Sequence, residues 1–177
     1  IGPATTLTMR ISAEMAPMSW AGTVLSQPPS KTTASIGYAA MSPQQVVASL
    51  AEIGYEAVGW TSAHFNPRTH TKDALRELIS ATRDAGLDVG EIVVQQDSVT
   101  LDAARREDRL AFSVECIEAA AKCGLPVLNF FTGPTPWDPE APVVGRHISE
   151  GAAWNITLRV YEKILEAAEK HQIRIAV

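Results

Sequence analysis

Residues 119–133 read Ala119-Ala120-Ala121-Lys122-Cys123-Gly124-Leu125-Pro126-Val127-Leu128-Asn129-Phe130-Phe131-Thr132-Gly133. A helix-forming run ends at Gly124, and an apolar segment typical of a buried strand follows almost at once. Strands that alternate with helices need crossover connections and are therefore parallel, so this junction predicts an α/β fold with a parallel sheet. The same order of helix, tight turn and strand recurs at Ile53-Gly54-Tyr55-Glu56-Ala57-Val58, at Ala85-Gly86-Leu87-Asp88-Val89 and, without a glycine, at His171-Gln172-Ile173-Arg174-Ile175.

Five strands and four helices follow from these junctions and from the hydrophobic periodicity. The first helix has the clearest start, because Ser42 and Gln45 form a capping box and Pro43 suits the first helical position. The predicted strands cover residues 34–40, 55–60, 88–95, 126–131 and 173–177, and the helices cover residues 43–53, 71–85, 106–123 and 150–171. The side chains expected to face inward are Val46, Val47, Leu50 and Ile53, then Leu75, Leu78, Ile79 and Thr82, then Leu110, Val114, Ile117 and Ala121, and finally Trp154, Leu158, Tyr161, Leu165 and Ala168.

The sheet is expected to curve into a barrel rather than stay open. The turn from Ala39 to Pro43 has no glycine-rich phosphate-binding motif, which weakens the case for a nucleotide-binding sheet. A (β/α)8 barrel takes ~250 residues, and the spacing of the predicted strands matches its first half. We expect a TIM-barrel-type parallel (β/α) repeat over residues 33–177 with about five of the eight strands. Residues 1–32, rich in Pro, Met, Ser and Thr, are predicted to be an N-terminal extension or linker.

A half-barrel leaves apolar surface to be covered. Five parallel strands cannot close an eight-stranded barrel, so two sheet edges would stay open. We expect residues beyond this sequence, or association with other copies, to cover them, and we predict a homo-oligomer.

Charge and composition exclude several classes of partner. The formal net charge of the 177 residues is -5, so the chain lacks the basic field of a nucleic-acid-binding protein. No apolar run approaches the roughly 20 residues that span a bilayer, so no membrane partner is expected. Cys116 and Cys123 lie about two turns apart on one predicted helix, where they can neither bridge nor clamp a metal. We expect two reduced cysteines in a cytoplasmic protein.

Three segments carry a resemblance to a known family: Leu50–Val58, Ala119–Gly133 and Ala167–Val177. Over about Ala34 to Val177 the sequence resembles the xylose isomerase-like TIM barrels. That superfamily includes sugar and sugar-phosphate isomerases and epimerases, inosose dehydratases and endonuclease IV. The resemblance implies a barrel whose site lies at the C-terminal ends of the strands.

The resemblance also implies a divalent metal ion, of Mn, Mg, Co or Zn, held by Glu, Asp, His and Glu at the ends of strands five to eight. The metal polarises a carbonyl, and two glutamates move the proton beside it. The first Glu ligand normally follows a strand like Ile173–Val177 directly, one position past the last residue given. No catalytic residue and no metal ligand is therefore expected in this chain, and isomerase, epimerase or polyol dehydratase activity is expected if the chain continues beyond Val177.

The near wall of the site falls on the strand ends that are present. Aromatic and amide side chains there suit a polyol, whose apolar face stacks while its hydroxyls find donors and acceptors. Each of these side chains also has a purely structural alternative. His64 and Asn129 could satisfy backbone groups of the loops instead of a substrate. Trp60 and Phe131 could fill the barrel interior, and Trp137 could either close the site as a lid or pack against the barrel rim. The candidate substrate-binding residues are Tyr38, Trp60, His64, Gln95, Asn129, Phe131 and Trp137, with Met41, Gln96, Asp97 and Thr132 beside them.

Three functions compete. The first is a metal-dependent isomerase or epimerase of a sugar or sugar phosphate, working by proton transfer beside a carbonyl. The second is endonuclease IV-like phosphodiester cleavage, but Gln95-Gln96-Asp97 after the third strand lacks a histidine and the basic face is missing. The third is a non-catalytic half-barrel that binds or associates.

Overall fold

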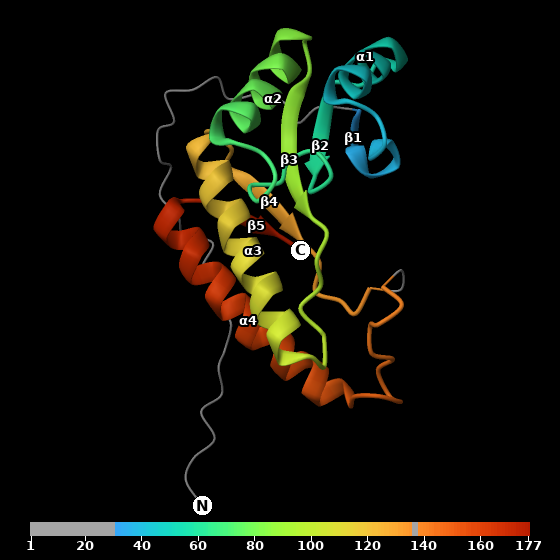
Figure 1. The fold of residues 1–177 in the computed structure, drawn as a ribbon, viewed down its shortest axis with the longest axis vertical. Coiled ribbons are helices and arrows are strands. Elements are labelled where there is room, and N and C mark those ends of the chain that lie inside the picture. Colours follow the sequence, from blue (N-terminus) through green and yellow to red (C-terminus); the bar gives the residue numbers. More distant parts are fainter. Residues whose placement is uncertain (1–30, 136–137) are drawn as a thin grey trace, which may run out of the picture.

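The computed structural model describes residues 31–135 and 138–177 (Figure 1). One five-stranded sheet has the spatial order β1-β2-β3-β4-β5, which is also the order along the chain, and every neighbouring pair is parallel. A sheet wound in one direction puts every helix on the same face, as in a barrel. The predicted parallel (β/α) repeat with five strands is confirmed. The strands are β1 (Thr32–Ala34), β2 (Ala57–Thr61), β3 (Asp88–Val94), β4 (Val127–Phe130) and β5 (Arg174–Ala176).

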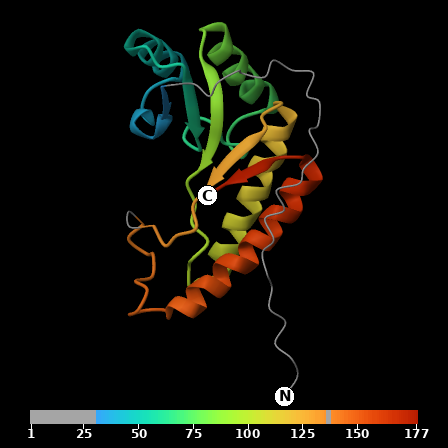
Figure 2. The ribbon, with the colours of Figure 1, turned by 180° about the vertical axis from the view of Figure 1, so that it is seen from behind.

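The described helices cover one face of the sheet, and we call the other, on which no described helix lies, the bare face. Figure 2 shows β3, β4 and β5 in front of α3 and α4, with no described helix on the near side. In Figure 1 the arrows of β2, β3 and β4 point toward one edge, where the long connections lie. The helices are α1 (Pro43–Ile53), α2 (Lys72–Asp84), α3 (Ala103–Lys122) and α4 (Glu150–His171), with a short 3-10 helix, η1 (Ser35–Tyr38), after β1. Among the described residues, no helix is long and apolar enough to cross a membrane.

Local signals fix the helix ends. Both bonds of the predicted capping box are present in α1: the amide of Gln45 donates to Ser42 Oγ at 3.3 Å, and the amide of Ser42 donates to Gln45 Oε1 at 2.8 Å. Gly54 ends this helix with a φ of 86°, a left-handed conformation that glycine adopts without strain. The predicted bounds of α4, residues 150–171, are those observed.

Two predicted elements differ from the structure. The first strand was expected at 34–40, but β1 ends at Ala34 and η1 follows, because Ser35 turns inward and its Oγ accepts the amide hydrogen of Thr61 on β2 at 3.0 Å. Helix α3 begins at Ala103 rather than 106, because Asp102 accepts the amide hydrogens of the first turn. β1 begins within the predicted extension, and residues 1–30 of that extension lie outside the described residues.

The core lies between the sheet and the helices. The predicted inward face of α2 is buried in full, whereas Ile53 of α1 is 60% exposed and therefore not a core residue. Three of the four residues of the predicted face of α3, Leu110, Val114 and Ala121, are only partly buried. The helix instead turns Phe112, Cys116 and Ala120 inward beside Ile117. The largest fully buried side chains are Trp60, Phe65, Phe130, Leu50, Ile92, Ile117, Leu128 and Ile164.

Helix α4 presents only part of the predicted face to the core: Ala168 is buried, and Tyr161 is half-buried and packs against the core. Trp154, Leu158 and Leu165 were expected inward, but they are 56%, 42% and 42% exposed. The helix packs against both α3 and β5, and that position turns a neighbouring stripe of smaller residues inward. The buried side chains of α4 are Ala153, Thr157, Val160, Ile164 and Ala168.

Candidate functional site

The bare face of the sheet is the side on which a barrel carries its interior groups. Side chains alternate along a strand, and Leu128 and Phe130 of β4 belong to the core under the helices. Asn129 between them therefore points to the bare face. In β3 the same alternation puts Ile92 in the core and Glu91 on the bare face. Polar groups from neighbouring strands thus meet on the open side.

Glu91 and Asn129 form a polar pair on that face. The amide nitrogen Nδ2 of Asn129 donates to Glu91 Oε2 at 3.2 Å. Gly59 of β2 is paired in register with Glu91 and makes room for it, because a Cβ at Gly59 would lie 3.2 Å from Glu91 Cγ. The side chains of both Glu91 and Asn129 are half-buried. The pair offers carboxylate acceptors and an amide, the groups that bind hydroxyls.

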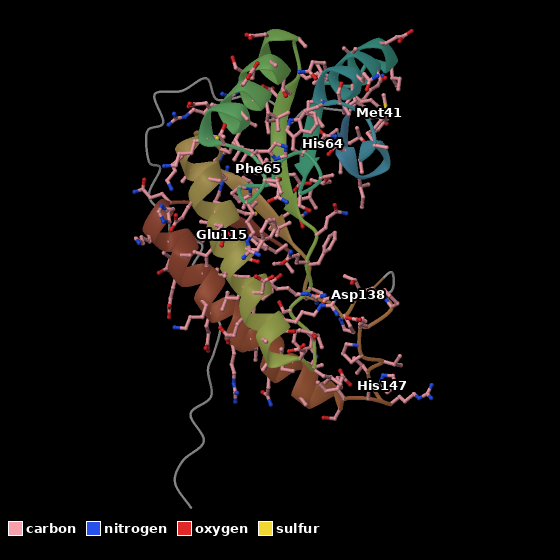
Figure 3. The ribbon with its side chains drawn as sticks, in the orientation of Figure 1. Met41, His64, Phe65, Glu115, Asp138 and His147 are labelled. Atoms are coloured by element: carbon pink, nitrogen blue, oxygen red, sulfur yellow. The ribbon has the colours of Figure 1, made fainter. Side chains whose placement is uncertain are left out.

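His64 is a linking residue in a buried network (Figure 3). Its Nε2 lies 3.0 Å from the carbonyl oxygen of Met41, so Nε2 carries the hydrogen and donates it. Its Nδ1 lies 3.2 Å from Ser35 Oγ and, in the neutral ring, accepts from that hydroxyl. The side chain is 5% exposed, and its ring packs edge-on against Trp60 with centroids 5.2 Å apart. Both ring nitrogens are therefore hydrogen-bonded within the protein. These bonds join His64, which follows β2, to the β1–α1 connection.

Trp60 and Tyr38 belong to the packed body of the protein. Trp60 is fully buried, and its Nε1 donates to Thr82 Oγ1 of α2 at 3.1 Å. This bond places the indole under the helices rather than on the bare face, and the role of Trp60 as a substrate contact stays a prediction. Tyr38 is half-buried and packs against the same core.

Three of the predicted substrate-binding residues lie at or near the ends of β3 and β4. Gln95 follows β3 and Phe131 follows β4, both half-buried, and Asn129 lies within β4, two residues before Phe131. Beside them, Gln96 Oε1 is buried and has no hydrogen-bond partner in the described part of the chain. Trp137 lies outside the described residues.

Five charged residues and one threonine join the connections after β3 and β4. We call them the loop cluster, which comprises Asp97, Arg105, Arg109, Thr135, Asp138 and Glu140. Asp97, whose side chain is 1% exposed, pairs with Arg109 at 2.7 Å, and Arg109 also pairs with Asp138 at 2.6 Å. Hydrogen bonding from Arg109 is the main reason that the pKa of Asp138 is lowered. Arg105 pairs with both Asp138 and Glu140.

Sequence reasoning missed Glu91, Arg109 and Asp138 as parts of this region. A signal for the cluster was present in the spacing of Arg105 and Arg109, one turn apart near the start of α3. Their acidic partners lie 12 to 35 residues away, so the sequence alone did not pair them.

No metal-binding group is visible in residues 31–135 and 138–177: no three His, Cys, Asp or Glu side chains there gather around one point. The bare face supplies one carboxylate, Glu91, with an amide beside it. A protein site for a divalent ion usually gathers several carboxylate or histidine ligands, and Glu91 has an amide rather than a second carboxylate beside it. We therefore assign no metal ligand among these residues.

The family model of the xylose isomerase-like TIM barrel matches residues 47–177 of the sequence. The chain belongs to this family. The match begins within α1 and runs through β5, so it covers most of the sheet and the ends of β3 and β4. A search of curated proteins gives no match.

Solved structures of xylose isomerase-like proteins share the fold at low sequence identity. A D-psicose 3-epimerase determined in the presence of D-fructose is 14% identical with a TM-score of 0.61. The match covers 82% of this chain and 50% of the epimerase chain. A xylose isomerase-like TIM barrel protein from Mycobacterium smegmatis in complex with magnesium is 16% identical with a TM-score of 0.61, at coverages of 83% and 53%. A mannonate dehydratase from Streptococcus suis is 16% identical with a TM-score of 0.56, at 82% and 50%. The chain thus spans about half the length of the solved structures that it matches.

Proposed function

We propose that this chain forms one wall of the sugar site of a divalent-metal-dependent isomerase or epimerase. The substrate is a small sugar or sugar phosphate, and the reaction moves a proton at the carbon beside its carbonyl. The observation that carries the proposal is the Glu91–Asn129 pair on the bare face of a xylose isomerase-like sheet, near the half-buried Gln95 and Phe131. Several structural neighbours are named as sugar epimerases, which supports a sugar as the ligand.

The residues described here bind and orient. Asn129 and Gln95 offer amide donors and acceptors to hydroxyls, and Glu91 offers carboxylate acceptors. Phe131 offers a flat apolar surface to the carbon-bearing face of a sugar. His64 joins the connections that follow β1 and β2, through its bonds to Ser35 and Met41.

The groups that transfer the proton belong to later strands of the fold, as the resemblance implies. A bound divalent ion, of Mn, Mg, Co or Zn, would polarise the carbonyl and so acidify the neighbouring C–H bond. A base on one face of the carbon then removes the proton, and return of a proton to the other face gives the epimer. Loss of water after the same abstraction would give a dehydratase, the activity named for one structural neighbour.

We extend the proposal to the state of the protein in the cell, a cytoplasmic homo-oligomer. Cys116 is buried, and Cys123 is free and half-buried, which suits a reducing compartment. Trp154, Leu158 and Leu165 on α4 are apolar and exposed, which suits association.

Deuterium exchange tests the proposed reaction. The natural protein that contains these residues is stripped with EDTA, reloaded with each of the four metals, and incubated in D₂O with D-fructose, D-psicose, D-tagatose and fructose 6-phosphate. Proton NMR should show metal-dependent loss of the hydrogen beside the carbonyl of at least one sugar. Exchange that is absent with every sugar and every metal would refute the proposal, and sugar binding without exchange would favour the non-catalytic module. Cleavage of abasic DNA by the same preparation would favour the endonuclease IV-like alternative.

A further inference from the structure

The loop cluster joins the two connections that border the proposed sugar wall. Asp97 lies two residues after Gln95, in the β3–α3 connection, and its Oδ2 accepts two hydrogen bonds from Thr135 in the β4–α4 connection, from Oγ1 at 2.8 Å and from the amide at 3.1 Å. The amide of Ser98 donates to the carbonyl oxygen of Thr132 at 3.1 Å. These bonds fix the chain as it leaves β4 against the chain as it leaves β3.

Gly133 shows how closely the two connections approach. Its φ is 77°, and a Cβ added there would collide with the Cβ of Asp97. Any side chain at position 133 would therefore push the β4–α4 connection away from Asp97. The close approach explains why the buried carboxylate of Asp97 can accept both bonds from Thr135.

Arg109 is the centre of this arrangement. Its two terminal nitrogens reach different loops: Nη1 donates to Asp97 at 2.7 Å and Nη2 donates to Asp138 at 2.6 Å. The side chains of Arg109 and Asp138 are 14% and 13% exposed, so the pairing is largely shielded from solvent. A planar guanidinium can span two carboxylates in this way, whereas a lysine ammonium is a single point charge.

We propose that Arg109 is a positioning residue of the sugar site: it holds the ends of β3 and β4 together so that Gln95, Asn129 and Phe131 present one preformed wall. The inference rests on the proposed function. Arg109 itself does not touch the substrate, and the proton-transferring groups are assigned to other strands. Its loss should therefore weaken binding equally in the ground state and the transition state, which raises KM and leaves kcat unchanged.

The matched control is Arg68. It too bridges two carboxylates, Glu115 at 2.6 Å and Asp108 at 2.8 Å, but it joins the β2–α2 connection to α3, and neither partner belongs to the loop cluster. Figure 3 shows Glu115 on α3 and Asp138 in the distant β4–α4 connection. Arg68→Met thus removes a similar pair of ion pairs without touching the wall. Asp138→Asn is a milder variant at the site, should Arg109→Met fold poorly.

The experiment compares these variants in the natural protein, with the sugar of the test panel that the wild type converts fastest. Arg109→Met and Asp138→Asn should each raise KM about fivefold or more, with kcat within about twofold, since small displacements of binding groups have large effects. The double variant should be no worse than Arg109→Met, because both changes break the same link. Arg68→Met should leave both constants unchanged.

Hydrogen exchange at the amides of Ser98 and Thr135 supplies a readout that needs no substrate. Arg109→Met should speed exchange at both amides, since they bond across the two connections, and Arg68→Met should not. An unchanged KM in Arg109→Met, an equal rise in Arg68→Met, or a fall in kcat at constant KM would overturn the inference while the proposed function stands. A wild type without activity would overturn the proposed function and the inference together.

Discussion

Burial at a single residue makes a chemical prediction for Cys116. Its side chain lies on the inner face of α3 with no exposed surface, and this desolvation raises the pKa of the thiol to about 12. Because the thiolate is the reactive form, Cys116 should resist iodoacetamide at pH 8, while the half-buried Cys123 reacts first. Peptide mass spectrometry measures the two rates, and guanidinium chloride should make them similar. Equal rates in the folded protein would contradict the burial of Cys116.

At the same scale, the sequence located polar groups but did not determine their partners. His64, Gln95 and Asn129 were expected near strand ends, and they lie there or one residue before. The role of His64 depends on Ser35, 29 residues earlier, and that of Asn129 depends on Glu91, 38 residues earlier. Contacts over such separations follow from the register of the sheet, which the sequence pattern of one strand does not specify.

At the scale of elements, α4 provides a direct comparison of two apolar faces. Ile164 is 2% exposed and its neighbour Leu165 is 42% exposed. In the 177-residue chain, Ile164→Ala should lower the free energy of unfolding by about 2–5 kcal/mol, because it leaves a cavity in the core. Leu165→Ala should change it by less than about 0.5 kcal/mol. Urea denaturation measures the free energy of unfolding of both variants. Equal losses would contradict the exposed position of Leu165.

The elements also show which signals are local. Caps such as Ser42 with Gln45 act within one turn, so the start of α1 and the bounds of α4 were predictable. The inward face of α4 was predicted only at Tyr161 and Ala168, because its sequence carries two adjacent stripes that are compatible with helical spacing. Packing against α3 and β5 decides that Ile164 rather than Leu165 is buried. The hydrophobic periodicity of α4 alone does not specify this tertiary packing.

For the whole molecule, the repeated junction of helix, turn and strand was sufficient to predict the topology. Each repeat adds one parallel strand and one helix on the same side, and the observed order β1-β2-β3-β4-β5 follows. The result is a sheet with helices on one face (Figure 2). Glu91 and Asn129 lie on the bare face. In the proposed enzyme, that face becomes the barrel interior once further strands close the sheet.

Native mass spectrometry of the natural protein, combined with metal analysis, tests this account most directly. We predict a mass well above the 19.0 kDa of these 177 residues, as a longer chain or an assembly, with about one divalent ion per closed barrel. Removal of that ion should abolish the deuterium exchange of sugars. A folded 19.0 kDa monomer that holds no metal would contradict the account, because a half-barrel alone would then be the complete protein.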